Sequence, residues 1–108
     1  MEPIQIDSEA EMLDGDEELF TEPLRTESMS VGIYRLQEGA TDPQEPHAED
    51  EAYYVLSGRA KLRVDETVHE LSTGDLVYVE REVDHEFFDI EEELTTLVFF
   101  APPYGSLE

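Results

Sequence analysis

From about residue 28 onwards, apolar and polar positions follow the two-residue period of β-strands that bury one face. Residues 59–64 alternate strictly, with basic side chains on one face and apolar side chains on the other. Other short segments are rich in β-branched and aromatic residues, and we predict further strands at residues 28–36, 52–56, 68–71, 76–79, 85–90 and 94–101. No helical period is sustained beyond Gly39. Many short strands at this spacing predict an all-β sandwich or barrel.

Turn residues separate these strands and indicate how the chain is organised. A loop rich in turn residues spans 39–46, and further turn signals lie at 57–58, 65–66, 72–75 and in the acidic run 91–93. We expect one domain over residues 1–108, with the barrel at 28–101, because a chain of this length builds one core. Residues 1–22 are predicted to form an acidic arm with one or two short strands, and a helix only near 8–13.

The charge of the chain limits the classes of partner that we expect it to bind. It has 29 acidic and 6 basic residues, a formal net charge of −23. Such a surface repels phosphate backbones and anionic lipids, so we expect neither nucleic acid nor membrane as a partner. Salt screens the self-repulsion, since the Debye length falls to about 3 Å at 1 M, and the composition therefore suits a halophilic cytoplasm. The N-terminus lacks the basic start and apolar middle of a signal peptide, which also predicts a cytoplasmic location.

Histidines and carboxylates are the candidate metal ligands, because the chain has no cysteine. His47 lies in a loop that enters a predicted strand, Glu51 follows four residues later, and His85 begins another strand. In a regular strand Tyr53 shares the face of Glu51, so two strand ends would direct these groups to one interior. We interpret His69, which lies apart from them, as structural.

These residues lie in a register that resembles the two sequence motifs of the cupins. The first motif, Gly-x5-His-x-His-x3–4-Glu-x6-Gly, is similar to the spacing of Gly39, Glu45, His47, Glu51 and Gly58. The second, Gly-x5-Pro-x-Gly-x2-His-x3-Asn, is similar to that of Gly74, Glu80, Glu82, His85 and Asp89. The resemblance implies a small double-stranded β-helix, or jelly-roll, barrel with an N-terminal arm.

The resemblance also implies one divalent transition-metal ion, bound by two histidines and the glutamate of the first motif and by the histidine of the second. His47, Glu51 and His85 match that set, and Glu45 replaces the usual first histidine. Glu45 is then a carboxylate ligand, with Gln44 as the alternative oxygen donor. A carboxylate in place of a histidine makes the ligand set a harder Lewis base than the usual one. Such a set favours iron or manganese, and zinc stays an alternative.

Other positions depart from the motifs or flank them. Glu80, Glu82 and Asp89 replace the proline, glycine and asparagine of the second motif, which affects the turn more than the site. We interpret Glu49 and Asp50 as loop surface, with a charged layer around the ligands as the alternative.

The resemblance leaves three functions open. One is a metal-dependent enzyme, such as an oxygenase or isomerase, with Tyr53 as an acid or hydrogen-bond donor. Another is a non-catalytic module that binds a small molecule, and the third is a metal-free isomerase or epimerase that uses histidine as a base. The family resemblance also implies a homodimer, for which the strand at 94–100 and the N-terminal arm are the expected contacts.

Overall fold

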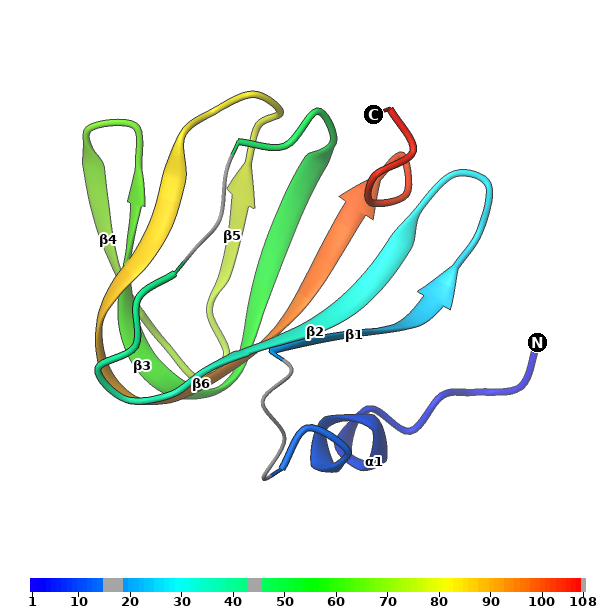
Figure 1. Cartoon of the computed structure of the whole chain (residues 1–108), viewed down its shortest axis with the longest axis horizontal. Coiled ribbons are helices and arrows are strands. Elements are labelled where there is room, and N and C mark those ends of the chain that lie inside the picture. The colour runs from blue at the N-terminus through cyan, green and yellow to red at the C-terminus, as the bar shows by residue number, and fades with distance from the viewer. Residues whose placement is uncertain (15–18, 43–45, 108) are drawn as a thin grey trace.

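Six strands form one curved antiparallel sheet in the computed structural model, which describes residues 1–14, 19–42 and 46–107 (Figure 1). One short helix precedes them. The elements are α1 (Ile6–Glu11), β1 (Phe20–Arg25), β2 (Ser30–Leu36), β3 (Asp50–Val64), β4 (Thr67–Ser72), β5 (Leu76–Val79) and β6 (His85–Ala101). Within the described residues, no helix has the length and apolar character needed to cross a membrane.

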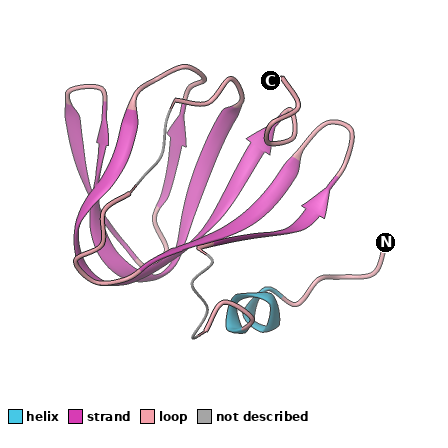
Figure 2. Ribbon diagram, viewed as in Figure 1, coloured by secondary structure: helices cyan, strands magenta, loops and turns pink. Residues whose placement is uncertain are grey.

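The strand order is β1-β2-β6-β3-β4, and β5 pairs with the first part of β3. The sheet curls over its length, which confirms the predicted all-β class (Figure 2). The strand β6 is hydrogen-bonded on both sides, by β2 and by β3. Residues 94–100 therefore have no free edge for a partner subunit, and the prediction of an edge contact there is wrong.

The two longest strands differ from the sequence prediction. The breaks expected at 57–58 and 91–93 are absent, and β3 and β6 each run through them with irregular register. Gly58 has a φ of 98°, and a Cβ at this position would lie 2.1 Å from the carbonyl oxygen of Glu93. A bulge with close backbone contact therefore bends the pair without ending it.

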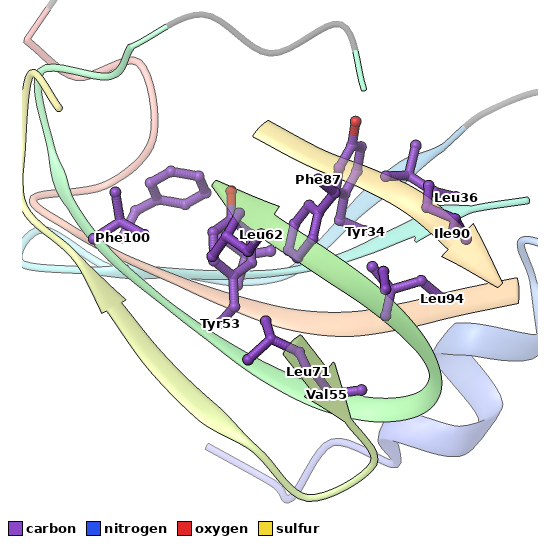
Figure 3. Packing of buried hydrophobic residues seen from close by; sticks show 13 residues of the cluster. Tyr34, Leu36, Tyr53, Val55, Leu62, Leu71, Phe87, Ile90, Leu94 and Phe100 are labelled. Carbon is purple, nitrogen blue, oxygen red and sulfur yellow. The ribbon is translucent and has the colours of Figure 1, made fainter. Parts of the chain in front are cut away.

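The core lies inside the curve of the sheet. Every residue of β2 is buried, and the inward positions of β3 alternate with positions that are partly buried or exposed. Of two adjacent aromatic pairs, Tyr53 and Phe87 are buried whereas Tyr54 is exposed and Phe88 is only partly buried. Figure 3 shows the rings of Tyr34 and Tyr53 among the core side chains, with their hydroxyl oxygens pointing to the same side. Burial of each large apolar side chain contributes about 1.5–3 kcal/mol.

The N-terminal segment packs on the outer face of the sheet. Ala10 and Leu13, in and just after α1, pack against Ile33 of β2. The buried Arg35 forms an ion pair with Asp14, and its Nε donates to the Thr95 hydroxyl at 3.1 Å. The expected helix near 8–13 lies at Ile6–Glu11, and β1 extends past the predicted limit of the arm at residue 22.

Candidate metal centre

His47, Glu51 and His85 come together although they lie on separate elements. One ligand atom from each lies within 4.8 Å of the other two. His47 is in the loop before β3, Glu51 is near the start of β3, and His85 is the first residue of β6. The partner of His85 across the sheet is Val64, at the opposite end of β3 from Glu51. The curvature of the sheet, rather than strand pairing, therefore closes this cluster.

The ring of His85 is held at both nitrogens. It is 1 % exposed, and its Nδ1 lies 3.0 Å from the carbonyl oxygen of Val83, which can only accept. We therefore assign the N–H to Nδ1 in the neutral ring. The other nitrogen, Nε2, lies 2.8 Å from Glu51 Oε1 and 3.2 Å from the Tyr53 hydroxyl. In this tautomer Nε2 carries no proton and faces the cluster. A histidine binds a metal through such an unprotonated nitrogen, while its other ring N–H donates a hydrogen bond.

The pKa of His85 reflects two opposing effects. Burial lowers the pKa, but the hydrogen bond to Glu51, the negative charge of Glu51 and the contact with Val83 outweigh it, so the pKa is raised above its ordinary value. Protonation of His85 at Nε2 would place a proton between this ring and Glu51 Oε1, 2.8 Å away, and would neutralise part of the buried charge. A metal ion would displace that proton, because it binds the neutral ring and the carboxylate.

The chemistry of Glu51 provides the test of whether a metal ion fits. Its side chain is 1 % exposed, and Oε2 is buried with no hydrogen-bond partner among the residues that the structure describes. A buried carboxylate oxygen without a partner is costly. A cation beside Glu51, His47 and His85 would supply the missing interaction. Two imidazoles and one carboxylate suit Fe²⁺, Mn²⁺ or Zn²⁺, so the residues fit the ion.

Aromatic rings and the backbone hold His47 in its loop. Its half-buried ring makes edge contacts with Phe100 and Tyr104, each with ring centroids 5.4 Å apart. Its carbonyl oxygen accepts a 2.7 Å hydrogen bond from the backbone N–H of Glu82. These contacts place the His47 ring 5.8 Å from that of His85.

The remaining predicted residues fall into two groups. Glu45 and Gln44 lie outside the described residues, so the structure does not address their role. Tyr53 is fully buried beside His85, whereas His69 is exposed on β4 and does not belong to the cluster.

The interpretation of Glu49 as loop surface is wrong. Its side chain is 1 % exposed, and both carboxylate oxygens are buried with no hydrogen-bond partner among the described residues. Glu49 lies in the bend just before β3, and its charge and loop position in the sequence give no local signal of burial. Asp50 does face the surface, where it accepts hydrogen bonds from the Tyr78 hydroxyl and the Arg81 N–H, each 3.0 Å long.

Sequence analysis also missed Asp42. This buried residue accepts hydrogen bonds from the Tyr34 hydroxyl at 2.6 Å and from the backbone N–H of Phe87 at 2.9 Å. It therefore ties the loop that leads to His47 to the strand that carries His85. An aspartate before a proline reads as a turn residue, so nothing local distinguished it.

Two substituted positions of the second motif have left-handed backbone conformations. Glu82 and Asp89, in place of glycine and asparagine, have φ values of 64° and 50°. Asp89 consequently points away from the face of His85 and forms a 3.0 Å ion pair with Lys61. The left-handed conformation is unfavourable for the glutamate at position 82, whereas aspartate tolerates it better.

Comparison with known proteins agrees with this geometry. The family model for the cupin domain matches residues 32–100, and the chain belongs to the cupin family. It is 49 % identical over 80 residues to an uncharacterized protein of Streptomyces coelicolor, covering 74 % of this chain and 76 % of that one. This result confirms the resemblance seen in the sequence.

Solved structures show the same fold at low identity. TT1209 from Thermus thermophilus superposes with a TM-score of 0.78 at 22 % identity, covering 95 % of this chain and 99 % of that one. An RmlC-like cupin from Shewanella frigidimarina superposes with a TM-score of 0.71 at 19 % identity, covering 82 % of this chain and 79 % of that one. These similarities confirm the small cupin barrel.

Proposed function

We propose that this cupin binds one divalent transition-metal ion through His47, Glu51 and His85, and binds or transforms a small molecule beside it. The observation that carries the proposal is Glu51 Oε2, a buried carboxylate oxygen without a partner among the described residues, next to two imidazoles. Iron, manganese and zinc all suit this ligand set. Glu45, or else Gln44, is the proposed further ligand, on the basis of the motif alone.

The chain would contribute orientation and a proton donor. A bound ion supplies Lewis acidity toward a carbonyl or water. Val83 holds the tautomer of His85, and Phe100 and Tyr104 hold the ring of His47. The Tyr53 hydroxyl lies 3.2 Å from His85 Nε2, which supports a role for it as hydrogen-bond donor to a ligand at the ion.

Elemental analysis of protein purified without chelator tests the proposal. Wild type is compared with Glu51→Gln, His85→Ala and the control His69→Ala, whose histidine is exposed and outside the cluster. We expect about one ion per chain in wild type and control, and a loss of most of it in the other two variants. Absence of ion from wild type, even after incubation with Fe²⁺, Mn²⁺ and Zn²⁺, would contradict the proposal.

A second candidate is metal-free acid–base chemistry. Glu51, His85 and Tyr53 form a hydrogen-bonded series of contacts through Nε2, at 2.8 Å and 3.2 Å. Such a series can move a proton without an ion. Activity that survives exhaustive chelation and is lost in His85→Ala would favour this candidate.

We also propose a homodimer in the cytoplasm. The edge of β1 is open in the sheet order, and several large apolar side chains on β3, β4 and β5 are exposed, namely Tyr54, Val68, Leu76 and Tyr78. Burial of such side chains against a second copy would remove apolar area from water. Light scattering after size exclusion at high salt tests this, and the mass of one chain would contradict it.

A further inference from the structure

The ring of Tyr104 lies between one proposed metal ligand and the solvent. Tyr104 belongs to the turn that follows β6, and its ring makes a T-shaped contact with that of His47, with centroids 5.4 Å apart and an interplanar angle of 75°. Phe100 and Phe20 flank the same ring, at centroid distances of 4.9 Å and 5.8 Å. Tyr104 is nevertheless 39 % exposed. One side of this residue therefore contacts the site while another side contacts water.

Solvent reaches the ligand cluster on the side of His47. Glu51 and His85 are 2 % and 1 % exposed, whereas His47 is half-buried and is the least buried of the three. On the inner side, the ring of Tyr53 packs beside His85 and against Phe87, and both of these aromatic residues are fully buried. A molecule that comes to the cluster from solvent therefore arrives beside His47, and so beside the ring that covers it.

The backbone of Tyr104 is held by a different part of the sheet. Its N–H donates a 3.0 Å hydrogen bond to the hydroxyl of Ser30, the first residue of β2, and its carbonyl oxygen accepts one of 3.0 Å from the guanidinium of Arg25, the last residue of β1. Ser30 is 1 % exposed, and the preceding Pro103 is buried. This turn, the β1–β2 hairpin loop and the loop before β3 lie at the same end of the molecule (Figure 1). Water can satisfy the backbone of an exposed turn, so these bonds serve to fix where the ring lies.

We propose that Tyr104 is the cover of the candidate metal centre and determines the size of the ligand that reaches it. With both backbone bonds in place, the ring blocks one side of His47, and only a small ligand passes beside it. A bulky ligand requires the turn to separate from Ser30 and Arg25. The selection by size rests on the proposed function, since it needs an ion at the cluster, whereas the cover over His47 rests on the contacts alone.

Modification of the histidines by diethyl pyrocarbonate tests the cover in the metal-free protein. The reagent acylates an unprotonated imidazole nitrogen, and at pH 8 an imidazole with the ordinary pKa of about 6.5 is mostly in that form. Peptide mass spectrometry gives a separate rate for each of the three histidines. We expect Tyr104→Ala to raise the rate at His47 by about fivefold, because the ring no longer shields it, while the rate at the exposed His69 stays unchanged.

Three further variants make the result specific. Tyr104→Phe keeps the ring and should keep the wild-type rate at His47. Ser30→Ala removes one anchor of the turn and should raise that rate by less than Tyr104→Ala does. Tyr54→Ala is the matched control, because Tyr54 is a tyrosine of β3 with nearly the same exposure, 37 %, and should change nothing at His47. An unchanged rate at His47 in Tyr104→Ala would overturn the proposal. Equal acceleration at the buried His85 would also overturn it, because Tyr104 would then support the whole fold.

Cobalt-loaded protein tests the selection by size, because the visible spectrum of Co²⁺ reports what binds to it. Imidazole is the small probe and 1-benzylimidazole the bulky one, on wild type, Tyr104→Ala and Tyr104→Phe. We expect the ratio of their dissociation constants, bulky over small, to fall by about tenfold in Tyr104→Ala alone. An equal ratio in all three proteins would overturn the selection by size. Failure of wild type to bind cobalt, iron, manganese or zinc would overturn the proposed function and this selection with it, and faster modification of His47 in Tyr104→Ala would still support the cover.

Discussion

The backbone N–H of Glu82 donates a 2.7 Å hydrogen bond to the carbonyl oxygen of His47. This bond joins the loop of the first motif to the turn that leads into His85. It therefore fixes the loop before β3 against the turn before β6, the two segments that carry His47 and lead to His85. Glu82 makes the bond with a φ of 64°, a conformation that suits glycine better than glutamate.

Replacement of Glu82 by glycine should stabilise the protein. Relief of the left-handed conformation is worth about 1–2 kcal/mol, and the extra freedom of glycine in the unfolded chain cancels roughly 0.5–1 kcal/mol of it. We expect a net gain of about 0.5–1 kcal/mol in the free energy of unfolding, measured with urea. The control Glu82→Ala removes the same charge without the relief, and an equal gain from it would contradict this explanation.

Two glycines with similar φ values should respond very differently to alanine. Gly58 has a φ of 98° and backbone atoms of Glu93 and Leu94 within 3 Å of an added Cβ, whereas Gly74 has a φ of 93° and open space around it. Gly74→Ala should cost about 1–2 kcal/mol from conformation alone. Gly58→Ala should cost about 3 kcal/mol or more, because the backbone must also separate. Similar urea midpoints for the two variants would disprove the contribution that we assign to the steric clash at Gly58.

Stability should fall in alkaline solution because of Tyr34. Burial, the hydrogen bond to Asp42 and the charge of Asp42 raise the pKa of Tyr34 well above its ordinary value. The unfolded chain loses this proton near pH 10 while the folded chain keeps it. The stabilisation is therefore complete below about pH 10 and declines above it, by up to about 1.4 kcal/mol per pH unit.

Urea unfolding between pH 8 and pH 11.5 measures this dependence. Tyr34→Phe should flatten it, while lowering stability at pH 7 by about 1–2 kcal/mol because Asp42 loses a buried donor. The control Tyr54→Phe changes an exposed tyrosine and should leave the slope unchanged. A slope that persists in Tyr34→Phe would show that another group causes it.

The net charge of −23 predicts that salt stabilises the fold. Repulsion among the acids opposes compaction and is screened as the Debye length shortens. The midpoint of thermal unfolding should rise between 0.05 M and 2 M NaCl at pH 7. The rise should shrink near pH 4.1, where the sequence pI lies and the net charge vanishes. A salt effect of equal size at both pH values would contradict the electrostatic explanation.

The sequence predicted the strands well where local alternation was strong. Residues 76–79 were predicted as a strand and form β5, and the strict alternation of residues 59–64 lies within β3. The prediction failed where a strand bends without ending, at Gly58 and at the acidic run 91–93. A glycine or a run of charges looks the same in a bulge as in a turn, because the difference lies in the partner strand.

The candidate site was predicted only in part, because burial also depends on what lies opposite a residue in space. The motif register selected His47, Glu51 and His85 by residue type and spacing. It missed Glu49 and Asp42, whose burial depends on what packs over them, and an acidic chain offers many similar carboxylates on its surface.

By itself, the sequence determined the residue types, the alternating faces of the strands and the close spacing of His47 and Glu51. Only the tertiary structure decided that His85 meets Glu51, because these residues lie at opposite ends of β3 in the pairing of the sheet. A two-residue period specifies which side of a strand faces inward, but it does not specify how far the strand curves. Register shifts and close backbone contacts, such as that of Gly58 with Glu93, set the curvature that brings the ligands together.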